Sequence, residues 1–368
     1  MIRVLIVDDM HTIRMVLRLI LESDPELSVI GEAGSGEDAL AFCRKFRPDI
    51  VTMDINMPGM GGYEAIRQIM NEAPCPIVVI TGIESQHLME VSFKALALGA
   101  LTVLSTPRGP SPDDAEAKNL IRQIKAMSAV KVVRRALWMR STSEKLNRDQ
   151  DLLAAPAKGT VSFKLQKAAQ LVAIGLSTGG PPALQTILSS LSSIFPLPIV
   201  VVQHISQGFI FGLASWLNNT TPIPCKIAKQ GETIQPGTAY LAPDNSHLTV
   251  MGNGKLWLDA SGPVGGHRPS VNVLFESVAR NFGAKAIGIL MTGMGQDGAQ
   301  GLKAMHQMGA YTIAQNEASS VIFSMPKTAI ELDAVEEVLD LSQIAPRLKS
   351  LTENISKQKE TPSDRREG

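Results

Sequence analysis

The chain has 368 residues, of which 44% are hydrophobic, and its 35 Lys and Arg residues balance its 35 Asp and Glu residues. This length exceeds that of a typical single domain, so we expect at least two. The balanced charge argues against nucleic acid or an anionic membrane as the main partner. The apolar runs are too short to cross a bilayer, and the first residues lack the pattern of a secretory signal. We therefore expect a soluble, cytoplasmic protein without membrane insertion.

The cysteines indicate a reducing compartment. The chain has three of them, Cys43, Cys75 and Cys225. They are widely separated in the sequence and follow no metal-ligand or disulfide spacing. Buried free thiols are the expected state.

The first third of the chain alternates strand patterns with helical patterns. "RVLIVDD", "DIVTMDI", "PIVVITG" and "GALTVLS" predict buried strands, and apolar residues between Ile13 and Leu21 recur at helical spacing. Buried strands that alternate with helices predict a doubly wound parallel α/β domain over residues 1–125.

A second α/β block follows a polar stretch. Residues 126–165 lack sustained periodicity and are interpreted as an interdomain linker. Strands are predicted over residues 166–352 in "LVAIG", "PLPIVVVQ", "TAYLAP", "AIGILMTG" and "AYTIAQ". "HLTVMG" and "KLWLDA" flank a Gly-Asn-Gly stretch and predict an antiparallel hairpin. Residues 353–368 are expected to form a disordered tail.

Three carboxylates stand at the C-terminal ends of predicted strands in the first block. Asp8 and Asp9 follow the first strand, and Asp54 follows "IVTM". Such strand ends line the ligand crevice of an open parallel sheet. Clustered carboxylates suit Mg²⁺, and a carboxylate beside it can attack phosphorus to form an aspartyl phosphate. The alternative is that Asp8 and Asp9 only cap the next helix.

"VLIVDD", "TMDINMPGMGGYEAI", "VVIT" and "ALALGA" resemble the receiver domain of bacterial two-component response regulators, over nearly all of residues 1–125. The resemblance implies a flavodoxin-like fold and a sensor histidine kinase as phosphodonor. It also implies that Asp54 is the phosphoacceptor and that Asp8 and Asp9 are the Mg²⁺ carboxylates. Asn56 would supply a backbone carbonyl to the metal, and Thr81 would be the switch hydroxyl.

The receiver-like segment departs from that pattern after its last strand. Receivers usually carry a lysine before the proline there, whereas Thr106 precedes Pro107 in this chain, and Val103 replaces a common aromatic. Thr106 offers a hydroxyl but no charge, and Arg108 lies close by in the sequence. We expect weaker activation by phosphorylation than in a member that retains the lysine.

The segment Gly175-Leu-Ser177-Thr-Gly179 satisfies G-x-S-x-G between a predicted strand and the helix-like "PPALQTIL". This is the context of a nucleophile elbow, whose following helix start offers amides to a developing oxyanion. A flavin or nucleotide phosphate loop is also rich in Ser, Thr and Gly. The segment around Ser177 contains neither Gly-Lys-Ser/Thr nor G-x-G-x-x-G, so the nucleophile is favoured there.

Candidate partners for this serine lie at other strand ends. His204 ends "PLPIVVVQH" and is either a general base or a satisfied strand-end histidine. Asp297, in "MTGMGQDGAQGL", either orients that imidazole or caps the next helix. His306 lies mid-helix and suits packing, whereas His247 and His267 lie in loop-rich sequence and could line a pocket. The remaining histidines are His11 and His87.

"AIGLSTGGPPAL", "VVQHI", "YLAPDNSHL", "HRPSVNVLF", "LMTGMGQDGAQGL" and "IAQNEASSVIFSMP" resemble the chemotaxis protein-glutamate methylesterases of the CheB family, in order from residue 170 to residue 340. The resemblance implies that Ser177 is the nucleophile, His204 the general base and Asp297 the orienting carboxylate. Met294 would give a backbone amide to the oxyanion hole. Asn272 stands where family members often have Asp, and we expect it to lie outside the chemistry.

The resemblance implies hydrolysis of glutamyl methyl esters on methyl-accepting chemoreceptors, deamidation of receptor glutamines, and no metal or cofactor in the catalytic domain. It further implies that the receiver blocks the catalytic site until Asp54 is phosphorylated. Two alternatives remain: a phosphate- or flavin-binding module, and a non-catalytic response regulator whose second domain only docks on partners.

Overall fold

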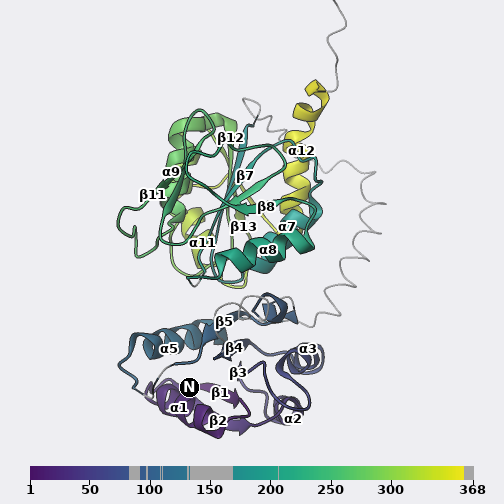
Figure 1. Ribbon diagram of the computed structural model, residues 1–368, viewed down its shortest axis with the longest axis vertical. Helices are drawn as coiled ribbons and strands as arrows, with labels where there is room; N and C mark the ends of the chain where they lie inside the picture. The colour runs from purple at the N-terminus through teal and green to yellow at the C-terminus, as the bar shows by residue number, and fades with distance from the viewer. Residues whose placement is uncertain are drawn as a thin grey trace, which may run out of the picture. The chain divides into compact units, whose positions relative to one another are not determined.

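The computed structural model describes residues 1–82, 92–96, 98–107, 109, 111–130, 132, 169–205 and 207–359. The chain divides into two compact units, Met1–Ser162 and Phe163–Gly368 (Figure 1). His87, Arg108 and residues 133–168, which include most of the predicted linker, lie outside the described residues.

The N-terminal unit is built on a five-stranded parallel sheet with the order β2-β1-β3-β4-β5. Its strands are β1 (Ile2–Val7), β2 (Leu27–Ala33), β3 (Ile50–Met53), β4 (Ile77–Thr81) and β5 (Thr102–Ser105). β1 lies between β2 and β3, so the strand order reverses there, and a ligand crevice is expected at the C-terminal ends of β1 and β3. Sequence analysis missed β2, because this edge strand is only partly buried and has no continuous apolar run.

Helices cover both faces of this sheet. α1 (His11–Glu22) packs with α5 (Ala115–Ser128), and α2 (Gly36–Phe46) packs with α3 (Gly62–Glu72) (Figure 1). The apolar spacing predicted α1 correctly, since its buried residues are Leu17, Ile20 and Leu21. The predicted doubly wound α/β fold of this unit is confirmed.

The C-terminal unit is built on a seven-stranded parallel sheet with the order β14-β13-β12-β6-β7-β9-β8. Its strands are β6 (Leu171–Leu176), β7 (Ile199–Gln203), β8 (Cys225–Ile227), β9 (Ala239–Leu241), β12 (Ala286–Leu290), β13 (Tyr311–Gln315) and β14 (Glu337–Leu339). β6, β7 and β12 are neighbours at the centre, so the loops that leave their C-terminal ends meet at one edge of the sheet.

The predicted antiparallel hairpin is also present. β10 (His247–Val250) pairs with β11 (Leu256–Asp259) in a separate two-stranded sheet. Leu248, Val250 and Leu256 are fully buried in a cluster that includes residues of the helix α9 (Val271–Phe282). The hairpin therefore joins the core of the C-terminal unit through one face.

The helices of the C-terminal unit lie on both faces of its sheet. α9, α10 (Ala299–Gln307) and α11 (Ser324–Glu331) lie on one face, and α7 (Gly180–Ser190), α8 (Ile210–Thr220) and α12 (Leu341–Lys359) on the other (Figure 1). The short 3₁₀ helix η1 spans Gly283–Lys285.

The expected disordered tail from residue 353 is wrong over its first part, because α12 continues to Lys359. The polar residues of that stretch include Lys, Gln and Glu, which are good helix formers, so they extend the helix anchored by Ile344 and Leu348.

All three cysteines are buried and free, as predicted. Cys43 and Cys75, distant in sequence, lie with their Sγ atoms 4.0 Å apart. No helix in the described part of the chain combines the length and apolar character needed to span a membrane.

Candidate active site

Ser177 occupies the turn between β6 and α7. Its N–H donates to Thr292 O at 3.0 Å, and its carbonyl accepts from Gly180 N at 2.9 Å. Gly179 has φ 78°, in the left-handed region that favours glycine. The predicted strand–turn–helix context of the serine is therefore confirmed.

Close packing explains the flanking glycines. A Cβ on Gly175 would lie 2.2 Å from Val271 Cγ1 of α9, and a Cβ on Gly180 would lie 2.0 Å from Gln203 Oε1. These glycines let α9 and the Gln203 side chain approach the backbone on either side of Ser177.

The start of α7 offers few free amides. Gly180 begins the helix and donates its N–H to Ser177 O, and Pro181 and Pro182 have no N–H to donate. The first turn is thus poor in donors for either an oxyanion or a phosphate, which disfavours a phosphate-binding loop. Oxyanion donors are then expected from the residue after Ser177 and from neighbouring loops.

His204 lies beside Ser177 at the same edge of the sheet. β6 and β7 pair with Leu176 opposite Gln203, and His204 N donates to Leu176 O at 2.9 Å. The Gln203 side-chain amide donates to both Ser177 O, at 2.7 Å, and His204 O, at 2.8 Å. The strand register and one buried glutamine therefore hold the two backbones together, as the shared strand edge predicted.

Asp297 reaches the same edge from the loop after β12. Its Oδ2 lies 2.9 Å from His204 Nε2 and accepts from Val271 N at 2.7 Å. Its Oδ1 accepts from Ser270 Oγ at 2.8 Å and Asn272 N at 3.1 Å. The alternative role as cap of the following helix is wrong, since the N-cap residue of α10 is Gly298. The carboxylate binds the N-terminus of α9 instead.

These contacts set the charge of Asp297. Burial acts to raise the pKa of the carboxyl, but the hydrogen bonds from His204, Val271 N and Asn272 N outweigh it and hold the pKa below its usual range. Asp297 is therefore an anion at neutral pH and accepts the Nε2–H of His204.

The other ring nitrogen of His204 is then the basic one. With the proton on Nε2, a neutral imidazole carries its lone pair on Nδ1. Nδ1 is buried and has no hydrogen-bond partner among the described residues, so it is not joined to Ser177 Oγ in this structure. Hydrogen bonds of this kind are often long without substrate and shorten in the reacting complex.

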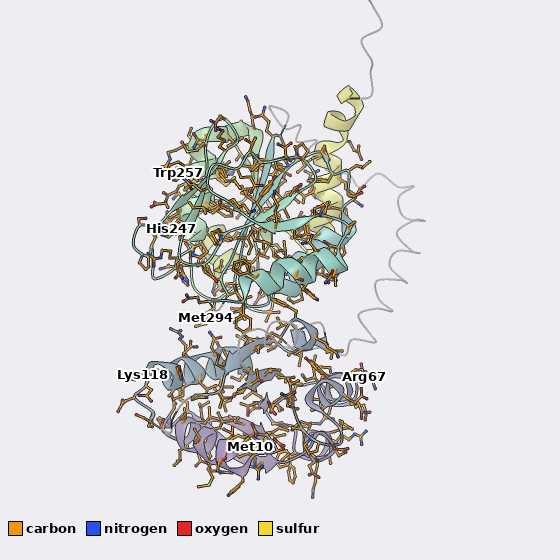
Figure 2. The ribbon with its side chains drawn as sticks, in the orientation of Figure 1. Met10, Arg67, Lys118, His247, Trp257 and Met294 are labelled. Atoms are coloured by element: carbon orange, nitrogen blue, oxygen red, sulfur yellow. The ribbon has the colours of Figure 1, made fainter. Side chains whose placement is uncertain are left out.

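The loop after β12 also packs against Ser177. A Cβ on Gly293 would lie 2.7 Å from Ser177 Cβ, and Met294 follows in the same loop (Figure 2). Within the described part of the chain, the N–H groups of Met294 and Thr178 donate to no acceptor. Both are candidate oxyanion donors. Sequence analysis missed Thr178, although the residue after the nucleophile is a common donor in such elbows.

Asn272 connects two helices at this site. Its side-chain oxygen accepts from Gly298 N at 3.0 Å and from Gly301 N at 2.8 Å, at the start of α10. The backbone amide of Asn272 contacts Asp297, whereas its side chain does not. The residue supports the carboxylate through its backbone, and its side chain binds the start of α10 instead.

The other histidines have separate roles. His267 stacks on His204 with ring centroids 4.0 Å apart and an interplanar angle of 2°. His247 is the first residue of β10, the strand predicted from "HLTVMG", and its side chain is fully buried (Figure 2). His306 lies in the last turn of α10 with Nδ1 3.1 Å from Thr312 Oγ1, and His11 begins α1.

A cavity of about 230 Å³ opens beside the catalytic candidates. Both stacked rings, His204 and His267, form part of its wall. The other lining residues are Gln203, Ile205, Gln207, Ile210, Ala242, Asp244, Asn245, Gly266, Arg268 and Pro269. His267 therefore lines a pocket, as predicted.

The second candidate site lies at the C-terminal edge of the N-terminal sheet. β1 and β3 pair with Val7 opposite Met53, which places Asp8 and Asp54 on neighbouring strand ends. Asp54 Oδ2 accepts from Asn56 N at 3.0 Å. Thr81, the last residue of β4, is buried, and Asp9 is exposed.

Comparison with known proteins assigns each of the two units to a known family. Residues 172–348 match the family model of CheB methylesterase, and residues 4–111 match that of the response regulator receiver domain. Protein-glutamate methylesterase/protein-glutamine glutaminase 1 of Syntrophus aciditrophicus is 45% identical, covering 97% of this chain and 100% of its own length. The chain belongs to the CheB methylesterase family.

A second relative covers nearly the whole chain, and a solved structure covers half of it. Protein-glutamate methylesterase/protein-glutamine glutaminase 4 of Myxococcus xanthus is 43% identical over 95% of this chain and 96% of its own length. The crystal structure of the Thermotoga maritima CheB methylesterase catalytic domain is 38% identical, with TM-score 0.49, and covers 50% of this chain and all of that one. This CheB-family protein is an ester hydrolase that carries a receiver domain, which favours the enzyme over a flavin-binding or purely docking module.

The acidic site of the receiver domain fits a divalent cation. Burial and the charges of Asp54 and Asp9 raise the pKa of Asp8 to about 6, against a hydrogen bond from Met10 N. Burial, with the charge of Asp9, also raises the pKa of Asp54. No group of three acidic, His or Cys side chains within the described ranges could hold a metal. A cation here would rest on Asp8, Asp54, the Asn56 carbonyl and water, a donor set that suits Mg²⁺.

Thr106 offers no charge to this site. Its N–H donates to Thr81 O at 3.1 Å, so it lies beside the predicted switch hydroxyl. Arg14 donates through Nη1 to Asp8 O at 2.7 Å and through Nε to Glu32, so its guanidinium is held by other partners.

The contact between Gly175 and α9 gives a stability prediction. Gly175→Ala should lower the free energy of unfolding of the C-terminal unit by about 1–3 kcal/mol, because the new methyl group meets Val271. Urea unfolding of the full chain measures it. Gly262→Ala is the matched control, since nothing lies within 4 Å of its added Cβ. Equal stability of both variants would contradict the assigned packing.

The raised pKa of Asp8 predicts a pH dependence of Mg²⁺ binding. Binding should weaken as the pH falls below about 6, because protonation of Asp8 removes a ligand charge. Isothermal titration calorimetry of the full chain with MgCl₂, on both sides of that pH, measures it. Asp8→Asn should bind weakly at both pH values, and Asp113→Asn, 95% exposed at the side chain, should behave as wild type. Equal affinity for wild type and Asp8→Asn would rule out the site.

Proposed function

We propose that this enzyme hydrolyses glutamyl methyl esters on methyl-accepting chemoreceptors through the triad Ser177, His204 and Asp297. The observation that carries the proposal is the His204 ring, bound through Nε2 to a buried anionic Asp297 and presenting a free Nδ1 at the edge where Ser177 lies. The names of the relatives, protein-glutamate methylesterase/protein-glutamine glutaminase, support the substrate class.

In the proposed reaction, His204 Nδ1 takes the proton of Ser177 as Oγ attacks the ester carbonyl. The imidazolium that forms is stabilised by the Asp297 carboxylate at 2.9 Å. The N–H groups of Met294 and Thr178 donate to the tetrahedral oxyanion. His204 then returns the proton to the departing methoxide, and methanol leaves.

Deacylation repeats the same proton transfers. His204 Nδ1 takes a proton from water, hydroxide attacks the acyl-enzyme, and the glutamate side chain leaves as Ser177 regains its proton. A glutamine side chain enters the same sequence when His204 gives its proton to the departing amide nitrogen, so that ammonia leaves, which gives receptor deamidation. The proposed chemistry of the catalytic domain is carried by these side chains and amides without a metal or cofactor.

The proposed control acts through the receiver domain. Residues 1–125 would form the receiver, 126–165 the linker and 166–352, with the rest of α12, the catalytic domain, acting in the cytoplasm. A sensor histidine kinase would donate a phosphoryl group to Asp54, and Asp8, Asp54 and the Asn56 carbonyl would hold Mg²⁺, which supplies positive charge for that group. A tethered receiver has a high effective concentration at the catalytic site, so a weak interface suffices to block it until Asp54 is phosphorylated.

The triad makes a direct prediction for catalysis. Ser177→Ala should abolish methanol release from methylated receptor membranes, and Asp297→Asn should lower kcat by about 10⁴, because an amide favours the wrong imidazole tautomer. Ser190→Ala, on an exposed turn of α7, is the control and should match wild type. Unchanged methanol release by Ser177→Ala would exclude the assigned nucleophile.

The missing receiver lysine makes a second prediction. Thr106→Lys should increase the activation of methanol release by a small phosphodonor, because it supplies the positive charge that Thr106 lacks. The measured quantity is the ratio of rates with and without phosphodonor, with Asp54→Asn as the variant that should not respond. Strong activation that is equal in wild type and Thr106→Lys would contradict the proposal.

A further inference from the structure

We propose that His267 is a positioning residue that fixes the plane of the His204 imidazole by face-to-face contact. The inference rests on the proposed function only in taking His204 as the base. The two rings are nearly parallel, at 2°, with centroids 4.0 Å apart. His267 stands outside the triad, and the sequence assigned it no role beyond a pocket wall.

The stacked ring supplies a restraint that the hydrogen bond to Asp297 does not. That bond fixes the position and direction of Nε2, at 2.9 Å from Oδ2, but leaves the ring free to turn about the Nε2–H axis. Such a turn would move Nδ1 away from the Ser177 side of the ring. A flat partner on one face opposes this rotation, because the rings lose contact when their planes diverge.

The loop that carries His267 is itself well anchored. His267 and Val264 exchange backbone hydrogen bonds, both 3.0 Å. Arg268 Nη1 donates to Ala260 O at 3.2 Å and Ser261 O at 3.1 Å. These contacts hold the loop on both sides of the stacked ring.

The buried His247 forms hydrogen bonds with both ends of this loop, at Gly262 and Ser270. Its Nε2–H donates to Gly262 O, and its Nδ1 accepts from Ser270 N, both at 3.1 Å. Ser270 in turn donates to Asp297 through Oγ. The loop therefore connects directly to the carboxylate at one end and presents His267 to His204 near its middle.

The restraint depends on the flat face of the stacked ring, which lies nearly parallel to His204 with ring centroids 4.0 Å apart. Another aromatic side chain at position 267 could therefore fill the same role.

The test compares side chains at position 267 that differ in flatness. His267→Phe keeps a planar face, whereas His267→Leu fills similar space without one, and His267→Ala removes the contact. We expect the Leu and Ala variants to lose about 10²-fold in kcat with KM unchanged, the cost of a misplaced catalytic group. His267→Phe should retain kcat near wild type.

Other patterns would overturn the proposal. A wild-type kcat in His267→Leu, or equal loss in the Leu and Phe variants, would show that flatness is irrelevant. A rise in KM with unchanged kcat would make His267 a substrate contact in the cavity. If His267→Ala does not fold, shown by its thermal unfolding, the Leu and Phe pair still decides the outcome.

A second measurement tests the role of His267 independently of the proposed receptor substrate. The rate at which a small sulfonyl fluoride labels Ser177, followed by mass spectrometry of the full chain, reports serine activation without a receptor. We expect fast labelling in wild type and His267→Phe, and slow labelling in His267→Leu and His204→Ala. If that order holds while receptor membranes release no methanol, the substrate proposal fails and the role of His267 stands. Equal labelling of the Phe and Leu variants overturns it.

Discussion

The catalytic edge of the C-terminal domain depends on one buried anion, Asp297. Two backbone amides and a hydroxyl at the start of α9 hold this carboxylate, and the remaining contact goes to His204 Nε2. The cost of burying a charge is offset by these hydrogen bonds and by the favourable dipole at a helix N-terminus. Because α9 also packs on Gly175, the helix that holds Asp297 lies directly against the strand that leads into Ser177.

Much of this arrangement could be predicted from the sequence because parallel sheets are regular. The apolar runs before Ser177 and His204 predicted β6 and β7, and parallel strands end at one edge, so two residues that follow such runs must be neighbours. The same rule placed Asp8 beside Asp54 in the receiver domain. Family motifs supplied the roles, which periodicity alone left open between nucleophile and phosphate loop.

The rest depends on contacts between distant segments, which leave no periodic signal. Three such contacts join residues far apart in the chain. They are the hydrogen bond from Val271 N of α9 to Asp297, the hydrogen bond from the Gln203 side chain to Ser177 O, and the stacking of His267 on His204. The end of α12 was misjudged because polar residues there are also good helix formers.

The central claim is that Asp297 fixes the imidazole of His204 with its proton on Nε2 and its lone pair on Nδ1. The ¹⁵N chemical shifts of the His204 ring, measured near neutral pH in the full chain and assigned with His204→Gln, test it most directly. The account predicts a protonated Nε2 and an unprotonated Nδ1, with that preference lost in Asp297→Ala. A proton on Nδ1 in the wild-type enzyme, with the lone pair on Nε2, would contradict it.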